Sequence, residues 1–296
     1  MPLMIIKPEE FKKEQPKASV ILPVFNGEQS PHYSRLLKEL RKQTFQDFEM
    51  IVSTGCSPNG RARNEGVAQA KGDFLFFIDE TVYLTGEKIF ENMLVPFESS
   101  SNIGIVGASC EAFPGISWIQ RQYFSSRSFH IPMVEKPYLG ARVQHACMVI
   151  PRKIYQKVGW ESDRLITGTD NDLRIRVARS GYDAVLVPEA LVYYEPPKSF
   201  FRMLEKSYQK GRGSAFAFMI YPGLFELSER FKIRQPILGV IYKIASTLRK
   251  FVSLRFLLSP VVLCCEVFIC LGFISGYFQW FGQKQDLLRR DLRWSS

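Results

Sequence analysis

The chain has 296 residues, 46% of them hydrophobic, and a formal net charge of +10. This length suits one large domain or two small ones, and the hydrophobic content suits a folded protein with a real core. The six cysteines include no C-x-x-C pair, which argues against a zinc cluster or disulfide framework and favours a reducing compartment. The positive charge indicates an anionic partner: nucleic acid, anionic lipid or a phosphorylated substrate.

The first half of the chain alternates between strand and helix patterns. Residues 1–17 are expected to form a polar N-terminal arm, since the opening MPLMII is too short and too quickly charged for a secretory signal. Short, mainly apolar runs predict buried strands over 18–25, 48–54, 73–79 and 101–109. Helical patterns lie between them over 30–43 and 61–72. This alternation predicts an α/β layer with a mainly parallel sheet flanked by helices.

The pattern after residue 140 is less regular. The segment 145–160 suggests a strand that leads into a short helix, and the segment from 170 suggests a helix that ends at Gly181. Strand material follows as far as residue 194. No repeat with a period of 20–50 residues is visible, which argues against a solenoid or propeller.

A long apolar segment at residues 256–281 is interrupted mainly by Glu266 and a few small polar residues. It exceeds the roughly 20 residues needed to cross a bilayer. Basic residues flank it on both sides: Lys243, Arg249, Lys250, Arg255, Lys284, Arg289, Arg290 and Arg293. We expect membrane contact through 236–281, as a crossing, a re-entrant hairpin or an in-plane helix. The alternative is a buried core helix.

Asp79 is the first candidate functional residue, because it ends an otherwise apolar strand. Ligands of α/β sheets bind outside the carboxyl ends of the strands. A carboxylate there suits a divalent cation held against phosphates, and Arg61 and Arg63 could pair with the same phosphates. The alternative is a solvated loop acid beside surface arginines.

Three segments together resemble the family 2 glycosyltransferases, which have the GT-A fold. ASVILPVFNGE (18–28) looks like the family's opening strand and turn. RARNEGVAQAKGDFLFFIDET (61–81) resembles its A-R-N-x-G-x-x-x-A-x-G run and F-x-D acidic motif. The segment 148–194 is similar to its second half, with an R-x-x-(Y/F)-x-x-x-G stretch, an E-D motif and an R-x-x-x-x-G-Y element. The resemblance covers about residues 18–215.

The resemblance implies an inverting sugar transfer from a nucleotide-diphosphate sugar. It assigns donor contacts to Pro23, Phe25, Asn26, Ser53, Arg63, Asn64 and Asp79, and a divalent metal, Mg²⁺ or Mn²⁺, to Asp79. The family's catalytic base maps to Asp170, which would remove the proton of the acceptor hydroxyl. An N-terminal helix cap is the competing interpretation of Asp170. Asp172 is expected to be a structural acid.

Gln209 and Arg212 have Q-x-x-R-G spacing, similar to the Q-x-x-R-W element of processive family members, with Gly213 in place of tryptophan. These two side chains share a helix face and could clamp a diphosphate or an acceptor, or they form a basic surface turn.

The chain also departs from the family pattern at three places. Ser53 and Thr54 replace an Asp pair that reads the nucleotide base, Glu80 directly follows Asp79 instead of standing two residues away, and Tyr193–Tyr194 replace a final His.

These features predict a GT-A domain over 18–225 and a membrane-associated helical region over 226–296. The leading hypothesis is an inner- or plasma-membrane glycosyltransferase with a cytoplasmic catalytic domain and a lipid-linked or glycan acceptor. The departures support an alternative, a non-catalytic partner in polysaccharide assembly. A nucleotidyltransferase would need a Gly-rich phosphate loop after the first strand, which this chain lacks. No nucleic-acid partner is expected, because no aromatic and basic platform stands out.

Overall fold

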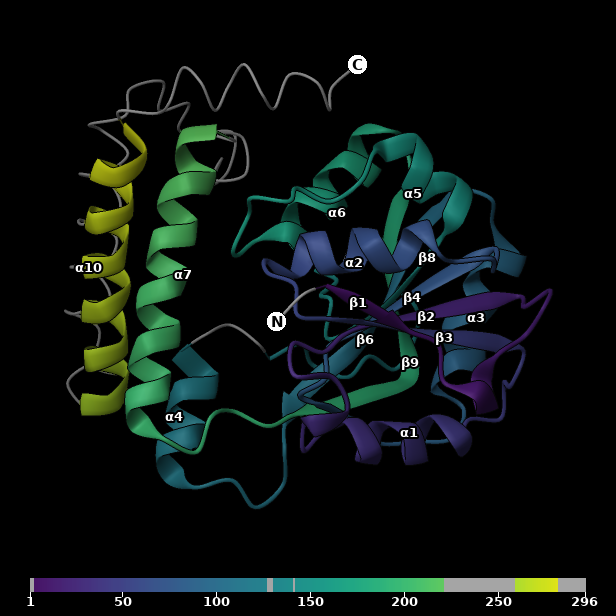
Figure 1. Cartoon of the computed structure of the whole chain (residues 1–296), viewed down its shortest axis with the longest axis horizontal. Helices are drawn as coiled ribbons and strands as arrows, with labels where there is room; N and C mark the ends of the chain where they lie inside the picture. The colour runs from purple at the N-terminus through teal and green to yellow at the C-terminus, as the bar shows by residue number, and fades with distance from the viewer. Residues whose placement is uncertain (1–2, 127–129, 141, 221–258, 282–296) are drawn as a thin grey trace. The chain divides into compact units, whose positions relative to one another are not determined.

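The computed structural model describes residues 3–126, 130–140, 142–220 and 259–281 (Figure 1). Contacts between residues divide the chain into two compact units. The first comprises the described residues of Met1–Gly115, Phe129–Arg164 and Thr169–Glu195. The second comprises those of Ile116–Ser128, Leu165–Gly168 and Pro196–Ser296.

A single sheet forms the centre of the first unit. Its strands are β1 (Met4–Ile6), β2 (Ala18–Pro23), β3 (Phe48–Thr54), β4 (Phe74–Ile78), β5 (Val82–Leu84), β6 (Ile103–Ala112), β7 (Tyr138–Leu139), β8 (Cys147–Pro151) and β9 (Asp183–Tyr194). Their order across the sheet is β1-β3-β2-β4-β8-β6-β9-β5, and β7 pairs with β9. The four strands expected in the first half of the chain correspond to β2, β3, β4 and β6.

The strand directions refine the expected parallel sheet into a mixed one. Strand β2 runs parallel to both β3 and β4, and β6 runs parallel to β9. Strand β8 is antiparallel to both of its neighbours, β4 and β6, and β1, β5 and β7 also pair antiparallel. The α/β architecture is confirmed, but the description "mainly parallel" needs this correction. Apolar runs indicate burial and leave strand direction undetermined.

Helices cover the sheet on both faces. They are α1 (Tyr33–Arg41), α2 (Asn59–Ala68), α3 (Ile89–Ser99), α5 (Arg152–Val158) and α6 (Thr169–Arg179), with short 3-10 turns η1 (Glu9–Phe11) and η2 (Gly27–Gln29). Figure 1 shows α1 and α2 on opposite sides of the sheet. Helix α2 lies close to the strands, because a Cβ atom at Gly66 would stand 2.7 Å from Cγ2 of Ile21. The small residues of this segment therefore allow the helix to pack closely on the sheet, as predicted.

Part of the expected N-terminal arm belongs to the sheet. Strand β1 pairs antiparallel with β3, with Ile5 opposite Ser53. The Lys7 ammonium lies 3.1 Å from the Glu49 carboxylate and fixes the chain just after this strand. The apolar MII segment thus covers an edge that would otherwise expose unpaired backbone groups of β3.

The second unit contains three described helices: α4 (Trp118–Ser126), α7 (Phe200–Ile220) and α10 (Pro260–Phe281). The backbones of helices α7 and α10 are in direct contact at their crossing. A Cβ atom added at Gly272 would stand only 2.1 Å from the Tyr208 carbonyl oxygen. A Cβ atom at Gly211 would stand 2.0 Å from the Ile269 carbonyl oxygen. Small residues at such crossings are typical of closely packed helix pairs.

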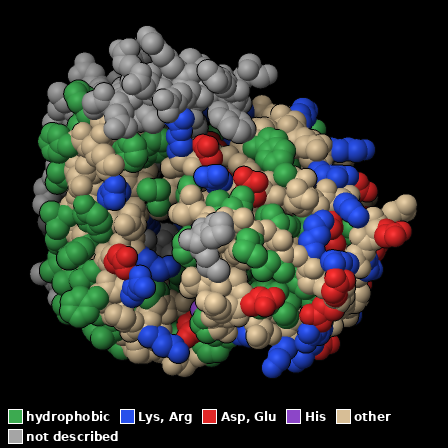
Figure 2. Space-filling model, viewed as in Figure 1, with side chains coloured by type: hydrophobic (Ala, Val, Ile, Leu, Met, Phe, Trp, Pro, Cys, Tyr) green, Lys and Arg blue, Asp and Glu red, His purple; other side chains and the backbone are tan. Residues whose placement is uncertain are grey.

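Helix α10 is long and apolar enough to cross a membrane, by length and composition alone. Apolar side chains gather along α10 on its side away from α7 (Figure 2). Its exposed large apolar residues are Val267, Leu271, Ile274, Phe278 and Phe281. The remainder of the expected membrane segment, 236–258, and the basic residues on both of its flanks lie outside the described residues.

Candidate active site

Asp79 stands directly after β4, at the carboxyl end of the parallel strands. Its backbone N–H donates to the Ala146 carbonyl at 3.3 Å, and its Oδ1 accepts from Arg63 Nη2 at 3.1 Å. The side chain is 34% exposed. Its Oδ2 has no protein partner among the described residues, so the carboxylate is held on one side and open on the other.

Arg63 projects from α2 into the interior and is only 3% exposed. Its Nη1 donates to Glu161 Oε2 at 3.0 Å and lies 3.5 Å from Thr169 Oγ1, at the start of α6. With the bond to Asp79, one guanidinium therefore joins the end of β4, the segment before α6 and α6 itself. The burial of Arg63 was not expected, because the resemblance implies a donor contact.

Glu161 is the buried carboxylate behind Arg63. Its Oε1 lies 2.6 Å from His145 Nε2. Burial opposes ionisation of Glu161, but the charges of His145 and Arg63 outweigh it and lower the pKa of Glu161 to about 2. Burial likewise opposes the charge of Arg63, yet Glu161 and Asp79 raise the pKa of Arg63. The chain His145–Glu161–Arg63–Asp79 is thus a continuous network of charged and polar groups.

Asn64 holds the backbone of Glu161. Its amide Nδ2 donates to the Glu161 carbonyl at 2.8 Å, and its Oδ1 accepts from the Glu161 N–H at 3.1 Å. The Tyr155 hydroxyl donates to the same Oδ1 at 2.9 Å. These bonds occupy both ends of the Asn64 amide, so the donor contact that the resemblance implies for Asn64 stays a prediction.

Asp170 lies in the first turn of α6 and is half-buried. Within the described part of the chain its carboxylate makes no hydrogen bond or ion pair, although its place in the first turn also suits the helix dipole. The neighbouring Asp172 is buried, and its Oδ2 lies 2.8 Å from Arg176 Nη2. This ion pair agrees with a structural role for Asp172. Arg63 Nη1 lies 3.5 Å from Thr169 Oγ1, so the first turn of α6 begins beside the arginine that bonds to Asp79. The role of Asp170 as the base stays a prediction.

The expected donor-contact residues at the ends of β2 and β3 differ in how exposed their side chains are. Pro23 is buried at the end of β2, and Phe25 and Asn26 are exposed just after it. Ser53 is 1% exposed, and its hydroxyl would lie 3.1 Å from a Cβ atom at Gly66 of α2. The Ser53 hydroxyl is thus packed against α2. The donor contacts of all four residues stay predictions.

Gln209 and Arg212 lie on α7, in the second unit. Arg212 Nη2 donates to Gln279 Oε1 of α10 at 2.5 Å. Gly213 leaves room for the segment before α6, since a Cβ atom there would stand 2.6 Å from Thr167 Oγ1. A larger side chain at position 213 would therefore clash with Thr167. The diphosphate or acceptor clamp stays a prediction.

The donor set allows one metal-binding mode. The described residues contain no group of three or more His, Cys, Asp or Glu side chains that could hold a metal ion. The neighbouring Glu80 accepts a hydrogen bond from the Ser30 hydroxyl on its Oε2 at 2.7 Å. Mg²⁺ is commonly held by one or two carboxylates together with substrate phosphates. The open oxygen of Asp79 fits that mode, as the protein's single ligand.

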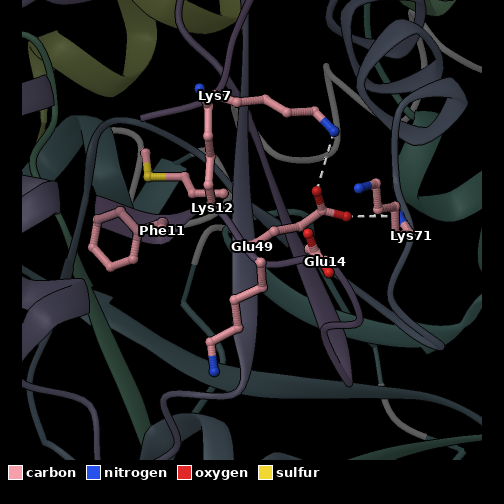
Figure 3. A pocket seen from close by; sticks show the side chains of 8 residues that line it. Lys7, Phe11, Lys12, Glu14, Glu49 and Lys71 are labelled. Atoms are coloured by element: carbon pink, nitrogen blue, oxygen red, sulfur yellow. Dashed lines mark hydrogen bonds and ion pairs between the residues drawn. The ribbon is translucent and has the colours of Figure 1, made fainter. Parts of the chain in front are cut away.

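A cavity of about 340 Å³ lies at the other end of the strands (Figure 3). Its lining residues are Lys7, Phe11, Lys12, Lys13, Glu14, Glu49, Met50 and Lys71. The Glu49 carboxylate accepts from Lys7 Nζ at 3.1 Å, from the Ser19 hydroxyl at 2.8 Å and from the Lys71 N–H at 2.6 Å. Glu49 is near the amino end of β3, whereas Asp79 follows the carboxyl end of the parallel strand β4. The cavity is therefore separate from the candidate site.

The buried network predicts a loss of stability in acid. The folded pKa of Glu161, about 2, lies below its ordinary value of 4.5. Ionised Glu161 therefore stabilises the fold above pH 4.5, and this contribution is lost as the pH falls from 4.5 to 2. We expect a contribution on the order of 3 kcal/mol to the free energy of unfolding, measured by denaturant titration at several pH values. Glu161→Gln should flatten this part of the pH profile; an unchanged slope would contradict the assignment.

Two of these residues were not identified from the sequence. Neither Glu161 nor His145 is among the candidates that the sequence indicated, and both are buried. The one indication of a residue such as Glu161 is chemical, because a buried arginine needs a buried carboxylate as its partner. Its position could not be predicted locally, because Glu161 is 98 residues from Arg63 in the chain.

Comparisons with known proteins place this geometry in a family. The family model described as glycosyltransferase like family 2 matches residues 12–213. A mannosyltransferase from Pyrobaculum calidifontis, solved with GDP-Man and Mn²⁺, has 12% identity and a TM-score of 0.55, over 88% of this chain and 87% of that chain. TarS residues 1–349 of S. aureus has 13% identity and a TM-score of 0.47, over 90% and 91%. No curated protein matches by sequence. The chain belongs to the family of glycosyltransferase like family 2 proteins.

Proposed function

We propose that the chain is a membrane-associated, inverting glycosyltransferase that moves a sugar from a nucleoside-diphosphate sugar to a lipid-linked or polysaccharide acceptor. The observation that carries the proposal is the position of Arg63. Its guanidinium bonds to Asp79 at the carboxyl end of the sheet and lies 3.5 Å from Thr169, the residue before Asp170. A half-open carboxylate and an unpaired one thus lie on neighbouring elements, as a two-substrate transfer requires.

The transfer requires a base for the acceptor and a place for the leaving group. Asp170, which has no hydrogen-bonding partner among the described residues, accepts the proton of the acceptor hydroxyl as that oxygen attacks the anomeric carbon. The bond from the anomeric carbon to the diphosphate breaks, and the nucleoside diphosphate leaves with the electron pair. A divalent cation on Asp79, when bound, supplies positive charge for the diphosphate. Attack from the face opposite the leaving group inverts the anomeric configuration.

Membrane association rests on α10 and its surroundings in the sequence. The helix is apolar, and five large apolar side chains on it are exposed. Basic residues before and after it in the sequence suit the anionic leaflet of a plasma or inner membrane. Nucleotide sugars are made in the cytoplasm, so we place the catalytic domain there. An acceptor linked to lipid would then meet the site at the membrane surface.

The alternative is a family member without catalysis that serves as a partner in polysaccharide assembly. The burial of Ser53 and the bond from Ser30 to Glu80 favour it, because both take away polar groups that would contact the donor or cation. The open oxygen of Asp79 and the unpaired Asp170 favour the enzyme.

Calorimetric titration of the full chain with uridine and guanosine diphosphates, each with and without Mn²⁺, separates the two functions. The enzyme is expected to bind one of them more tightly with Mn²⁺, and to hydrolyse the matching nucleotide sugar slowly without acceptor. A chain that binds neither nucleotide under either condition is the partner protein, and the proposal of catalysis is then wrong.

A further inference from the structure

We infer that Arg63, fixed from behind by Glu161 and His145, is a positioning residue that sets the spacing between Asp79 and the first turn of α6. The inference rests on the proposed function, because it assigns the donor side to Asp79 and the base to α6. It gives Arg63 a different role from the donor contact that the family resemblance implies.

The first argument is the number of elements that meet at one guanidinium. Arg63 comes from α2, Asp79 from the end of β4, Glu161 from the segment after α5, and Thr169 from the start of α6. The bonds of Arg63 to Asp79 and Glu161 measure 3.1 and 3.0 Å. A planar guanidinium fixes the directions of its donors, so it constrains where each partner lies.

The second argument is that Glu161 is itself held firmly. Asn64 bonds to both its N–H and its carbonyl group, and His145 contacts the carboxylate oxygen that Arg63 does not use. The His145 ring meets Phe77 edge to face, with centroids 5.8 Å apart, so it is anchored against β4. Arg63 therefore rests on a support with few degrees of freedom.

The third argument concerns exposure. The side chain of Arg63 is 4% exposed, and that of Asp79 is 34% exposed. A ligand in solution can therefore contact the Asp79 carboxylate, whereas almost none of the Arg63 guanidinium is accessible to it. Arg63 thus acts on the reaction through the residues that it holds.

Stability alone does not account for such a network. Buried ion pairs are often replaceable by uncharged residues without loss of stability, whereas removal of one partner is strongly destabilising. This difference separates a positioning role from a structural one. A variant that loses the charges of both Arg63 and Glu161 should keep the fold. It should lose the alignment of Asp79 with the first turn of α6.

The test compares Arg63→Met with the double variant Arg63→Met/Glu161→Gln in the full chain. The single variant leaves Glu161 buried without its cation, and its Tm should fall by roughly 10 °C. The double variant should recover most of that loss. Its kcat for transfer should nevertheless stay lower by on the order of 100-fold, with a smaller change in KM for the donor. Amide hydrogen exchange in the first turn of α6 should be faster than in the wild type.

A matched control neutralises another ion pair with a buried carboxylate, at the opposite ends of the strands. In Lys7→Met/Glu49→Gln, kcat and the exchange of α6 should remain those of the wild type. Wild-type kcat and wild-type exchange in Arg63→Met/Glu161→Gln would overturn the inference and leave the network a purely stabilising one. If the wild type transfers no sugar, the proposed function fails, and the exchange of α6 still decides whether Arg63 positions that helix.

Discussion

Replacement of Asp170 by asparagine should lower the turnover of sugar transfer by roughly 10²–10⁴-fold and leave donor binding nearly unchanged. The amide keeps the size of the side chain and removes its ability to take up the acceptor proton. The local structure should tolerate the change, because the Asp170 carboxylate makes no hydrogen bond or ion pair within the described residues. Steady-state transfer rates and calorimetric binding of the nucleoside diphosphate measure the two effects separately.

Asp163→Asn is the matched control for Asp170→Asn. Asp163 is an exposed acid, 3.9 Å from Arg164, on the segment that leads to α6. Its loss changes the net charge by the same amount, so any effect on long-range electrostatics appears in both variants. We expect wild-type turnover for Asp163→Asn. Equal turnover of Asp170→Asn and the wild type would remove Asp170 from the mechanism.

Asp79→Asn should lower kcat/KM by roughly 10²–10³-fold and abolish the effect of Mn²⁺ on nucleotide binding. The Asp79 carboxylate bonds to Arg63 through one oxygen, and its other oxygen is left open for a cation among the described residues. Arg63 keeps its partner Glu161 in this variant, so the fold should persist. Calorimetry with a nucleoside diphosphate, at several Mn²⁺ concentrations, measures the loss directly.

Asp73→Asn serves as the control for Asp79→Asn at the opposite end of β4. Its side chain is 76% exposed and lies 3.8 Å from Arg152. This variant should retain wild-type binding and Mn²⁺ dependence. If Asp79→Asn retained the Mn²⁺ dependence as well, the metal would be held by other groups and the assignment to Asp79 would be wrong.

The local sequence was sufficient to predict the strands and the helix that carry the site residues. The apolar runs predicted β2, β3 and β4, and the position of Asp79 just after the last of them followed from where the apolar run stops. The small residues of 61–72 predicted a helix close to the sheet, which the close approach of Gly66 to Ile21 confirms. These features depend on neighbours along the chain, so periodicity and composition reveal them.

Side-chain environments were not predictable in the same way. Arg63 was expected to be a donor contact and is buried between Asp79 and Glu161. Ser53 was expected to face a nucleotide and is covered by α2. In each case the deciding neighbour comes from another part of the chain, and no local pattern encodes it.

The sequence by itself determined the α/β class, the family and the residue types at the end of β4 and the start of α6. Only the tertiary structure decided that Arg63 joins those two elements, that Glu161 and His145 hold it there, and that β8 runs against its neighbours. The physical reason is the distance along the chain between the residues that interact. Backbone patterning reflects a few adjacent residues, whereas the partner of a buried charge is chosen by the packing of segments about 100 residues apart.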